Sequence, residues 1–349
     1  MPSIEGGGVE KNFFITANFF SKRINDLSII TTSKSSKNKL SKKINLILPE
    51  GDYWENTSRR LKYFICLFLL IKSIIYNKNL TVFAFQANLY CVLVCKFFGI
   101  AIITRSNSAP SGWSKNSVKV KIYKYFLNKA DAVMVNSIEF KKQMKDYFGI
   151  DTHCIYNPLN KNEIIYKSKK KTKNIFGKQK TLKIINIGRF VDQKDQETLI
   201  KALNLIKNKI EFQARIIGKG NLREKLEKLI NKYKLSHKVK LINFKKNPYN
   251  YLKQSDVFIL TSLYEGLPNV LLEALTLKKF IISSDCPTGP KEILLNGKGG
   301  LIFKTRNATQ LSKKIIFYHN NKKTCEKMIE KSFKRLNRFD QKKNLDKYL

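Results

Sequence analysis

Two glutamates and the turn between them are the residues of this sequence best suited to chemistry. Glu265 and Glu273 enclose the segment Glu265-Gly-Leu-Pro-Asn-Val-Leu-Leu-Glu273, which separates an apolar strand-like run from a helix-like run. We expect a helix over 269–277, with Pro268 suited to the first helical position, and a helix start favours an anion because its N–H groups and dipole are positive. Backbone N–H groups from Gly266 to Asn269 then point at the ligand. Two carboxylates beside a phosphate site suit a ligand with both a diphosphate and hydroxyl groups, such as a nucleotide sugar.

Two cations follow another strand-like run. Arg189 comes directly after the run 182–188, and Lys194 lies just before a helix-like segment. An arginine fork and a lysine point charge at one strand end can neutralise a diphosphate. A second glycine-containing turn, Gly218-Lys-Gly220, ends a later run and is a weak signal by itself. The cations therefore predict that the same ligand carries a diphosphate.

The elements that position these residues alternate regularly between strand-like and helix-like segments. Such alternation predicts parallel, doubly wound α/β sheets, which bind ligands at the carboxyl ends of their strands. A Lys-rich stretch after Asn157-Pro158 divides the pattern, and we expect two Rossmann-like domains that face each other across a cleft. The predicted parts are an N-terminal domain at 1–160, a Lys-rich linker at 161–180, a second domain at 181–330 and a C-terminal helix at 331–349 that crosses back to the first domain. The β-like runs of the second domain are 182–188, 212–218, 239–243, 256–261, 280–284 and 300–303.

Composition sets the outer bounds on function. The chain has 349 residues, of which 43% are hydrophobic, so two domain cores can be buried. The net charge of +41 indicates either a polyanionic partner, such as nucleic acid or an acidic membrane, or a compositional bias toward Lys. Aromatic residues interleaved with basic ones, typical of nucleic-acid binding, are not evident. We therefore expect no nucleic-acid partner.

Cysteine usage and hydropathy bear on location. Six cysteines lack the close paired spacing of a zinc site, and no signal peptide precedes them, which predicts a reducing cytoplasm. The apolar stretch 80–103 is long enough to span a membrane but divides more naturally into strand, helix and strand. Residues 61–76 predict a basic, aromatic helix suited to peripheral contact with the inner face of an anionic cytoplasmic membrane.

In this order, the three motifs of the second half resemble a known family. Gly188-Arg189 with Lys194, then Gly218-Lys-Gly220, then the nine-residue segment from Glu265 look like the donor half of retaining glycosyltransferases with the GT-B fold, family 4. The resemblance is strong over about 182–303. In the first half, Gly6-Gly-Gly8 is similar to the N-terminal glycine loop of the family. The run Asp285-Cys-Pro-Thr-Gly-Pro-Lys-Glu292 resembles members that build lipid-linked or surface polysaccharides, often from N-acetylhexosamine donors.

The resemblance implies roles for individual residues. Arg189 and Lys194 bind the diphosphate and stabilise it as it leaves. Glu265 binds sugar hydroxyls and supports positive charge at the anomeric carbon, whereas Glu273 holds the ribose hydroxyls. A solvated turn residue at Glu265 and a helix-surface carboxylate at Glu273 are the structural alternatives. The remaining predicted ligand-binding residues are Gly7, Gly8, Gly188, Gly218, Gly266, Leu267, Pro268, Asn269 and Val270.

The implied activity is a retaining, metal-independent glycosyl transfer without a cofactor. A hexose or N-acetylhexosamine passes from a nucleotide sugar, expected to be a UDP-sugar, to a lipid-linked or surface-polysaccharide acceptor. Attack occurs on the front face, and the departing phosphate takes the acceptor proton. The alternatives are another GT-B enzyme, namely a nucleotide-sugar epimerase or a phosphorylase, and a basic nucleic-acid-binding protein.

The first half departs from the family in two ways. Many relatives have a His where this chain reads Ile103-Thr-Arg105-Ser-Asn107, so either a cleft-facing or a purely structural role is open for Arg105 and Asn107. Only five residues precede Gly6, and Pro2 among them cannot donate to a strand ladder. We therefore expect that the first, central strand of the domain is missing here and that the natural protein begins upstream of Met1.

Overall fold

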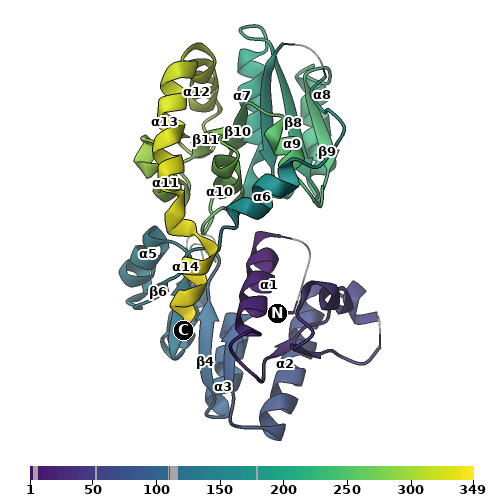
Figure 1. Cartoon of the computed structure of the whole chain (residues 1–349), viewed down its shortest axis with the longest axis vertical. Coiled ribbons are helices and arrows are strands. Elements are labelled where there is room, and N and C mark those ends of the chain that lie inside the picture. The colour runs from purple at the N-terminus through teal and green to yellow at the C-terminus, as the bar shows by residue number, and fades with distance from the viewer. Residues whose placement is uncertain (3–6, 52, 109, 111–116, 178–179) are drawn as a thin grey trace. The chain divides into compact units, whose positions relative to one another are not determined.

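The computed structural model describes residues 1–2, 7–51, 53–108, 110, 117–177 and 180–349. The chain forms two compact units (Figure 1). The first unit comprises Met1–Pro158 together with Asn344–Leu349, and the second comprises Leu159–Lys343. Both contain parallel sheets with helices in alternation, as the sequence predicts.

The second unit is built on one six-stranded parallel sheet with the strand order β12-β11-β10-β7-β8-β9. All four residues of β10 and all five of β11 are buried, because helices cover both faces of the sheet. Apolar runs of strand length are what such a doubly covered sheet requires. The strands are β7 (Leu182–Ile187), β8 (Phe212–Gly218), β9 (Val239–Asn243), β10 (Val257–Leu260), β11 (Phe280–Ser284) and β12 (Leu301–Phe303).

Helices alternate with these strands along the chain, as in a doubly wound domain. Part of the Lys-rich segment 161–180 forms α6 (Lys161–Ser168), which packs against α9 and α10 of the second unit. Asn160 caps α6, since its side chain accepts a hydrogen bond from the Glu163 N–H. The other helices are α7 (Gln196–Ile206), α8 (Arg223–Lys232), α9 (Tyr249–Lys253), α10 (Asn269–Thr276), α11 (Pro290–Ile293), α12 (Ala308–Asn320), α13 (Lys322–Lys334) and α14 (Gln341–Leu345), within which the unit boundary falls.

The first unit contains two separate parallel sheets. One holds β1 (Ser28–Ile30) and β2 (Asn45–Ile47), and the other has the order β3-β4-β5-β6. Among the described residues no strand precedes the first helix. Instead, the Met1 ammonium donates to Ile30 O at 2.6 Å, so the chain start lies beside β1. The second sheet comprises β3 (Thr81–Ala84), β4 (Ala101–Arg105), β5 (Ala132–Val135) and β6 (His153–Cys154).

The longer helices of the first unit pack on these sheets. A shared apolar core joins α2, α3, β3 and β4, and includes Leu70, Ile74, Val92 and Ile102. Residues 80–103 therefore form strand, helix and strand. In the described part of the chain no helix is both long and apolar enough to cross a membrane. The helices are α1 (Gly8–Phe20), α2 (Arg59–Tyr76), α3 (Asn88–Phe97), α4 (Ser117–Asn128) and α5 (Ile138–Phe148).

Candidate active site

The carboxyl ends of three neighbouring strands bring the predicted donor residues together. β10, β7 and β8 are adjacent and parallel, so the loops that follow them lie at one edge of the sheet. Arg189 follows β7, Gly218 ends β8 and Glu265 follows β10. Lys194, just before α7, lies at the same edge, and its Nζ is 2.5 Å from Glu265 Oε1. An ion pair thus joins two predicted site residues that are 71 positions apart in the chain.

The Lys194–Glu265 pair is largely shielded from solvent. The two side chains are 18% and 9% exposed. Their segments are also tied together, since Gln193 Nε2 donates to Tyr264 O at 2.9 Å and Thr261 Oγ1 donates to Lys194 O at 2.8 Å. Removing one partner would leave a charge with little water to solvate it. The pair is therefore held in place before any ligand binds, and the interpretation of Glu265 as a solvated turn residue is wrong.

Close backbone approach explains the glycines beside this pair. A Cβ on Gly218 would lie 1.9 Å from Gly188 O, so only glycine fits there. Gly220 has a φ of +155°, and a Cβ would lie 2.3 Å from Phe190 O. At Gly188, in contrast, a Cβ would meet the Lys194 stem at 3.5 Å, an ordinary contact. The ends of β7 and β8 thus approach each other closely beside Lys194.

The turn after Glu265 leads into α10 at Asn269, where the helix-like run predicted from the sequence begins. Pro268 has φ −70° and ψ 105° and is the N-cap, so the first helical residue is Asn269. The prediction of Pro268 as that residue is wrong because its ψ is extended. Gly266, Leu267 and Pro268 are buried, whereas Asn269 and Val270 are partly exposed at the helix start. The start of a helix carries a partial positive charge, so this end of α10 suits an anion.

A second loop braces the backbone at Glu265. Glu265 N donates to Pro287 O at 2.6 Å, and the Thr288 hydroxyl donates to Gly266 O at 2.9 Å. Gly289, with φ +90°, packs so closely that a Cβ would lie 2.5 Å from Gly266 O. Thr288 is completely buried. The segment 287–289, which belongs to the run noted for its family resemblance, therefore fixes the position of the Glu265 carboxylate.

Thr288→Val is expected to lower kcat for sugar transfer by about tenfold, because the shape is kept while the hydroxyl that holds Gly266 is lost. The donor KM should change less. Steady-state kinetics and the midpoint of thermal unfolding, Tm, measure both effects. Thr276→Val is the matched control, since this buried hydroxyl donates to Leu272 O at 2.8 Å within α10. An equal loss of Tm in both variants, with kcat intact in both, would show that Thr288 only stabilises the fold.

Glu273 is buried on α10 and contacts a tyrosine from a neighbouring helix. The Tyr249 hydroxyl of α9 donates to Glu273 Oε1 at 3.1 Å. Both residues are buried, so the interpretation of Glu273 as a helix-surface carboxylate is wrong. Sequence reasoning missed Tyr249, which lies 24 positions away on an element without a recognisable motif. Tyr249 orients the carboxylate that the family resemblance assigns to ribose binding.

Tyr249→Phe is expected to raise the donor KM about three- to tenfold with little change in kcat, because one hydrogen bond that orients Glu273 is lost. Tyr318→Phe is the control, since the Tyr318 hydroxyl donates to Asp256 O, just before β10 and thus at the opposite edge of the sheet. An unchanged donor KM in Tyr249→Phe would contradict the orienting role.

Arg189 lies in the loop after β7 with an exposed side chain. Its carbonyl oxygen accepts a hydrogen bond from Gln196 Nε2 at 2.9 Å. Gln196 is the first residue of α7 and is buried, and sequence reasoning did not identify it. The loop is therefore anchored by its backbone while the guanidinium points into solvent at the edge where Lys194 and Glu265 lie.

Two predicted ligand-binding glycines belong to the first unit. Gly7 is the N-cap of α1 and Gly8 its first residue, so both lie at a helix start. Gly6 falls outside the described residues. The binding roles of Gly7 and Gly8 stay predictions.

Arg105 and Asn107 hold the backbone of the first unit. Arg105 is buried, and its guanidinium donates to Asn157 Oδ1 at 3.1 Å and to the Tyr348 hydroxyl. Burial lowers the pKa of this guanidinium below its ordinary value. Asn107 Nδ2 donates to Phe85 O at 3.2 Å. For both residues these contacts favour the structural alternative over a role toward ligand.

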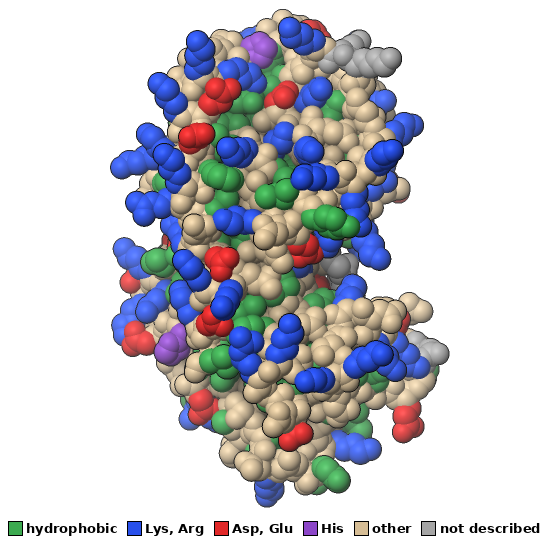
Figure 2. Space-filling view, in the orientation of Figure 1, with side chains coloured by type: hydrophobic (Ala, Val, Ile, Leu, Met, Phe, Trp, Pro, Cys, Tyr) green, Lys and Arg blue, Asp and Glu red, His purple; other side chains and the backbone are tan. Residues whose placement is uncertain are grey.

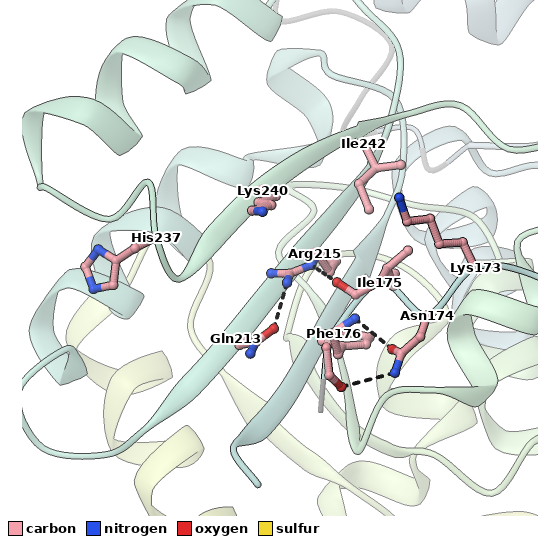
Figure 3. A pocket seen from close by; sticks show the side chains of 10 residues that line it. Lys173, Asn174, Ile175, Phe176, Gln213, Arg215, His237, Lys240 and Ile242 are labelled. Carbon is pink, nitrogen blue, oxygen red and sulfur yellow. Dashed lines mark hydrogen bonds between the residues drawn. The ribbon is translucent and has the colours of Figure 1, made fainter. Parts of the chain in front are cut away.

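A pocket of about 410 Å³ lies elsewhere in the second unit (Figure 3). Its buried cation, Arg215, donates to Ile175 O at 2.5 Å and to Gln213 Oε1 at 2.7 Å. The guanidinium is thus satisfied by the protein itself. None of the predicted site residues lines this pocket, whose walls are Lys173, Asn174, Ile175, Phe176, Gly177, Gln213, Arg215, His237, Lys240 and Ile242.

Comparison with known sequences connects this geometry to a family. Residues 168–335 match the family model of glycosyl transferases group 1. An uncharacterized glycosyltransferase of Methanocaldococcus jannaschii is 37% identical over 187 residues, which are 51% of this chain and 46% of that protein. The N-acetylgalactosamine-N,N'-diacetylbacillosaminyl-diphospho-undecaprenol 4-alpha-N-acetylgalactosaminyltransferase of Campylobacter jejuni is 27% identical over 232 residues, or 64% of this chain and 62% of that protein. The chain thus spans 46% and 62% of the lengths of these curated relatives.

Comparison with solved structures identifies the fold. The crystal structure of Anabaena HepE in complex with UDP and glucose matches with a TM-score of 0.80 and 15% identity, over 100% of this chain and 96% of that chain. Sucrose-phosphate synthase from Thermosynechococcus elongatus matches with a TM-score of 0.79 and 16% identity, over 98% and 92%. The fold of this chain is therefore GT-B, as the sequence predicts.

Proposed function

We propose that this chain, whose residues 168–335 match the family model of glycosyl transferases group 1, moves a hexose or N-acetylhexosamine from a UDP-sugar to a lipid-linked or surface-polysaccharide acceptor. The name of the Campylobacter relative describes transfer of N-acetylgalactosamine to a diphospho-undecaprenol-linked acceptor. The structurally similar Anabaena protein binds UDP and glucose. Both support a nucleotide-sugar donor and a glycan acceptor.

The observation that carries this proposal is the shielded Lys194–Glu265 pair beside the closely packed glycines at the ends of β7 and β8. In glycosyl transfer the bond between the anomeric carbon and the diphosphate breaks, which makes the carbon positive and the leaving oxygen negative. Glu265 is suited to the first charge, and Lys194 with Arg189 to the second. A site whose charged groups are already fixed in position needs little rearrangement as the reaction proceeds.

The proposed mechanism retains the anomeric configuration. The acceptor hydroxyl attacks the face from which the diphosphate leaves, and its proton passes to the departing phosphate oxygen. Because Lys194 and Arg189 supply the positive charge that stabilises the leaving group, the proposal includes neither a metal ion nor a cofactor. Glu273 binds the ribose hydroxyls, and the start of α10 receives the phosphates.

The test is turnover with UDP-glucose or UDP-N-acetylglucosamine and an undecaprenyl-diphosphate-linked sugar as acceptor. We expect UDP release only when the acceptor is present, and an NMR spectrum in which the new bond keeps the donor's anomeric configuration. An inverted bond would exclude retention. UDP release or donor isomerisation without acceptor would indicate an epimerase, and sugar-phosphate formation with inorganic phosphate would indicate a phosphorylase.

The high positive charge does not by itself indicate a nucleic-acid partner. On the face that Figure 2 shows, Lys and Arg side chains are spread over both units. A lipid-linked acceptor, in contrast, lies in a membrane. We therefore also propose that the enzyme is cytoplasmic and that its helix α2 contacts the anionic inner face of the cytoplasmic membrane.

A further inference from the structure

The pocket of about 410 Å³ in the second unit lies beside the edge strand of the sheet (Figure 3). β8 contributes Gln213 and Arg215 to it, and β9 contributes Lys240 and Ile242. The segment 173–177, which precedes β7, covers the same residues, since Arg215 Nε donates to Ile175 O at 2.5 Å. We call this pocket the β8–β9 recess. Its volume suits a small molecule.

Arg215 carries a buried positive charge that no carboxylate neutralises. The residue is only 5% exposed. Its guanidinium donates to three backbone carbonyls and to the side-chain oxygen of Gln213, all of which are uncharged. In the described part of the chain no Asp or Glu forms an ion pair with it, and burial lowers the pKa of the guanidinium. Buried charges are normally paired with an opposite charge, which an anion in the β8–β9 recess would supply.

Lys240 places a second positive charge beside Arg215. In the parallel pairing of β8 with β9 the two residues are direct partners, so their side chains leave the same face of the sheet. Neighbouring strands lie about 5 Å apart, and like charges directly opposite each other are destabilising. An anion bound between the two cations would replace this repulsion with two attractions.

The other ionisable residues that line the β8–β9 recess are also basic. They are Lys173 and His237, and no Asp or Glu is among the lining residues. The ammonium groups of Lys173 and Lys240 form no ion pair or hydrogen bond with any described residue. Glu211, two positions before Gln213, is already paired with Lys238 at 3.0 Å. The β8–β9 recess therefore gathers positive charge that its own walls do not balance.

We propose that the β8–β9 recess binds a phosphate group, either free or in a small phosphate monoester such as a sugar phosphate. A guanidinium has five N–H groups, and the four acceptors of Arg215 leave one N–H of Nη2 for the ligand. The ammonium groups of Lys240 and Lys173 add two charge-assisted contacts. Apolar walls at Ile175 and Ile242 leave room for an organic part. This site is separate from the donor residues, and it does not depend on the proposed sugar transfer.

Isothermal titration calorimetry of the full chain with glucose 6-phosphate, inorganic phosphate and glucose tests this site at constant ionic strength. We expect binding of the phosphates and none of glucose, because the recess recognises negative charge. Tighter binding of glucose 6-phosphate than of inorganic phosphate would identify a monoester as the ligand, and equal binding would identify free phosphate. Binding of neither would overturn the proposal.

Two double variants test whether the phosphate lies in the β8–β9 recess. Lys173→Gln with Lys240→Gln should weaken phosphate binding about tenfold, because two charge-assisted contacts are lost. Lys323→Gln with Lys327→Gln is the matched control, since it removes the same charge from exposed positions of α13, which packs against β11. Both variants should keep the wild-type Tm. Equal losses of phosphate binding in the two variants would show only general attraction to a basic protein and would overturn the proposal.

A crossed comparison separates this site from the donor edge. Arg189→Gln should weaken binding of UDP and leave binding of glucose 6-phosphate unchanged, whereas Lys173→Gln with Lys240→Gln should do the reverse. Loss of glucose 6-phosphate binding in Arg189→Gln alone would place the phosphate at the donor edge and overturn the proposal. If UDP does not bind even the wild type while glucose 6-phosphate binding still requires Lys173 and Lys240, the proposed function fails and the β8–β9 recess stands.

Discussion

Glu265→Gln is expected to lower kcat for sugar transfer by about a hundred- to a thousandfold, with a much smaller change in the donor KM. The amide keeps the shape of the side chain but removes the negative charge that, in the proposed mechanism, stabilises the developing positive charge at the anomeric carbon. Lys194→Met should cause a loss of similar size, because the proposed role of Lys194 is to stabilise the leaving diphosphate. Steady-state kinetics with saturating acceptor measures both variants.

The double variant Glu265→Gln with Lys194→Met distinguishes a cooperating pair from two independent residues. If the pair acts as one unit, its loss of kcat is clearly smaller than the product of the single losses. The effects of the two substitutions on the free energy of unfolding should not add up. Glu265→Gln alone leaves Lys194, only 18% exposed, without its carboxylate and should lower the free energy of unfolding by about 2–3 kcal/mol. The double variant, which has no such charge, should be more stable than Glu265→Gln alone.

A surface ion pair of similar length supplies the control. Lys145 Nζ lies 2.6 Å from Asp151 Oδ2, but the two side chains are 58% and 82% exposed. Asp151→Asn should leave both Tm and kcat unchanged, because water replaces the lost partner. Glu265→Gln would contradict the proposed mechanism if it kept wild-type kcat while its Tm fell. The pair would then only stabilise the loop.

Gly218→Ala is expected to destabilise the second unit by about 3 kcal/mol. The added methyl group would lie 1.9 Å from Gly188 O and 2.8 Å from a ring atom of Phe190. The first of these neighbours is backbone, which cannot turn aside as a flexible side chain can. The ends of β7 and β8 must therefore separate, and thermal or denaturant unfolding measures the loss. Unchanged stability would mean that the two strand ends are not this close.

Gly188→Ala, at the end of β7, is the matched variant. A Cβ there meets only the Lys194 stem at 3.5 Å and the Gln196 amide at 3.6 Å, so Tm should change little. The donor KM should nevertheless rise about tenfold if the diphosphate lies against this backbone, because a methyl group would keep it away. Thermal-shift titration with UDP measures the same effect without turnover. Unchanged UDP binding would show that the phosphates lie elsewhere.

Local patterns in the sequence predicted the second unit closely. The expected runs 212–218, 239–243 and 280–284 coincide with β8, β9 and β11. This success has a physical reason, since strands covered on both faces must be apolar along their whole length and end at polar turns. Because ligands bind at the carboxyl ends of parallel strands, the positions of Arg189 and Glu265 after two such runs were enough to predict that both lie at one edge.

The same local patterns failed where backbone geometry or burial mattered. Pro268 is the N-cap and not the first helical residue, because its ψ is set by the turn that precedes it. Arg105 had two open interpretations in the sequence. The structure favours the structural one, since its guanidinium is buried against Asn157 and the C-terminal Tyr348.

By itself the sequence determined the alternation of strands and helices in both halves, the GT-B resemblance and the positions of Arg189 and Glu265 after two of the strands. These properties depend on apolar spacing and turn residues within short segments. Only the tertiary structure decided which side chains meet: Lys194 with Glu265 across 71 positions, Tyr249 with Glu273 across 24, and Thr288 with Gly266 across 22. Such contacts depend on which strands become neighbours and how closely their ends approach, and no local pattern specifies those distances.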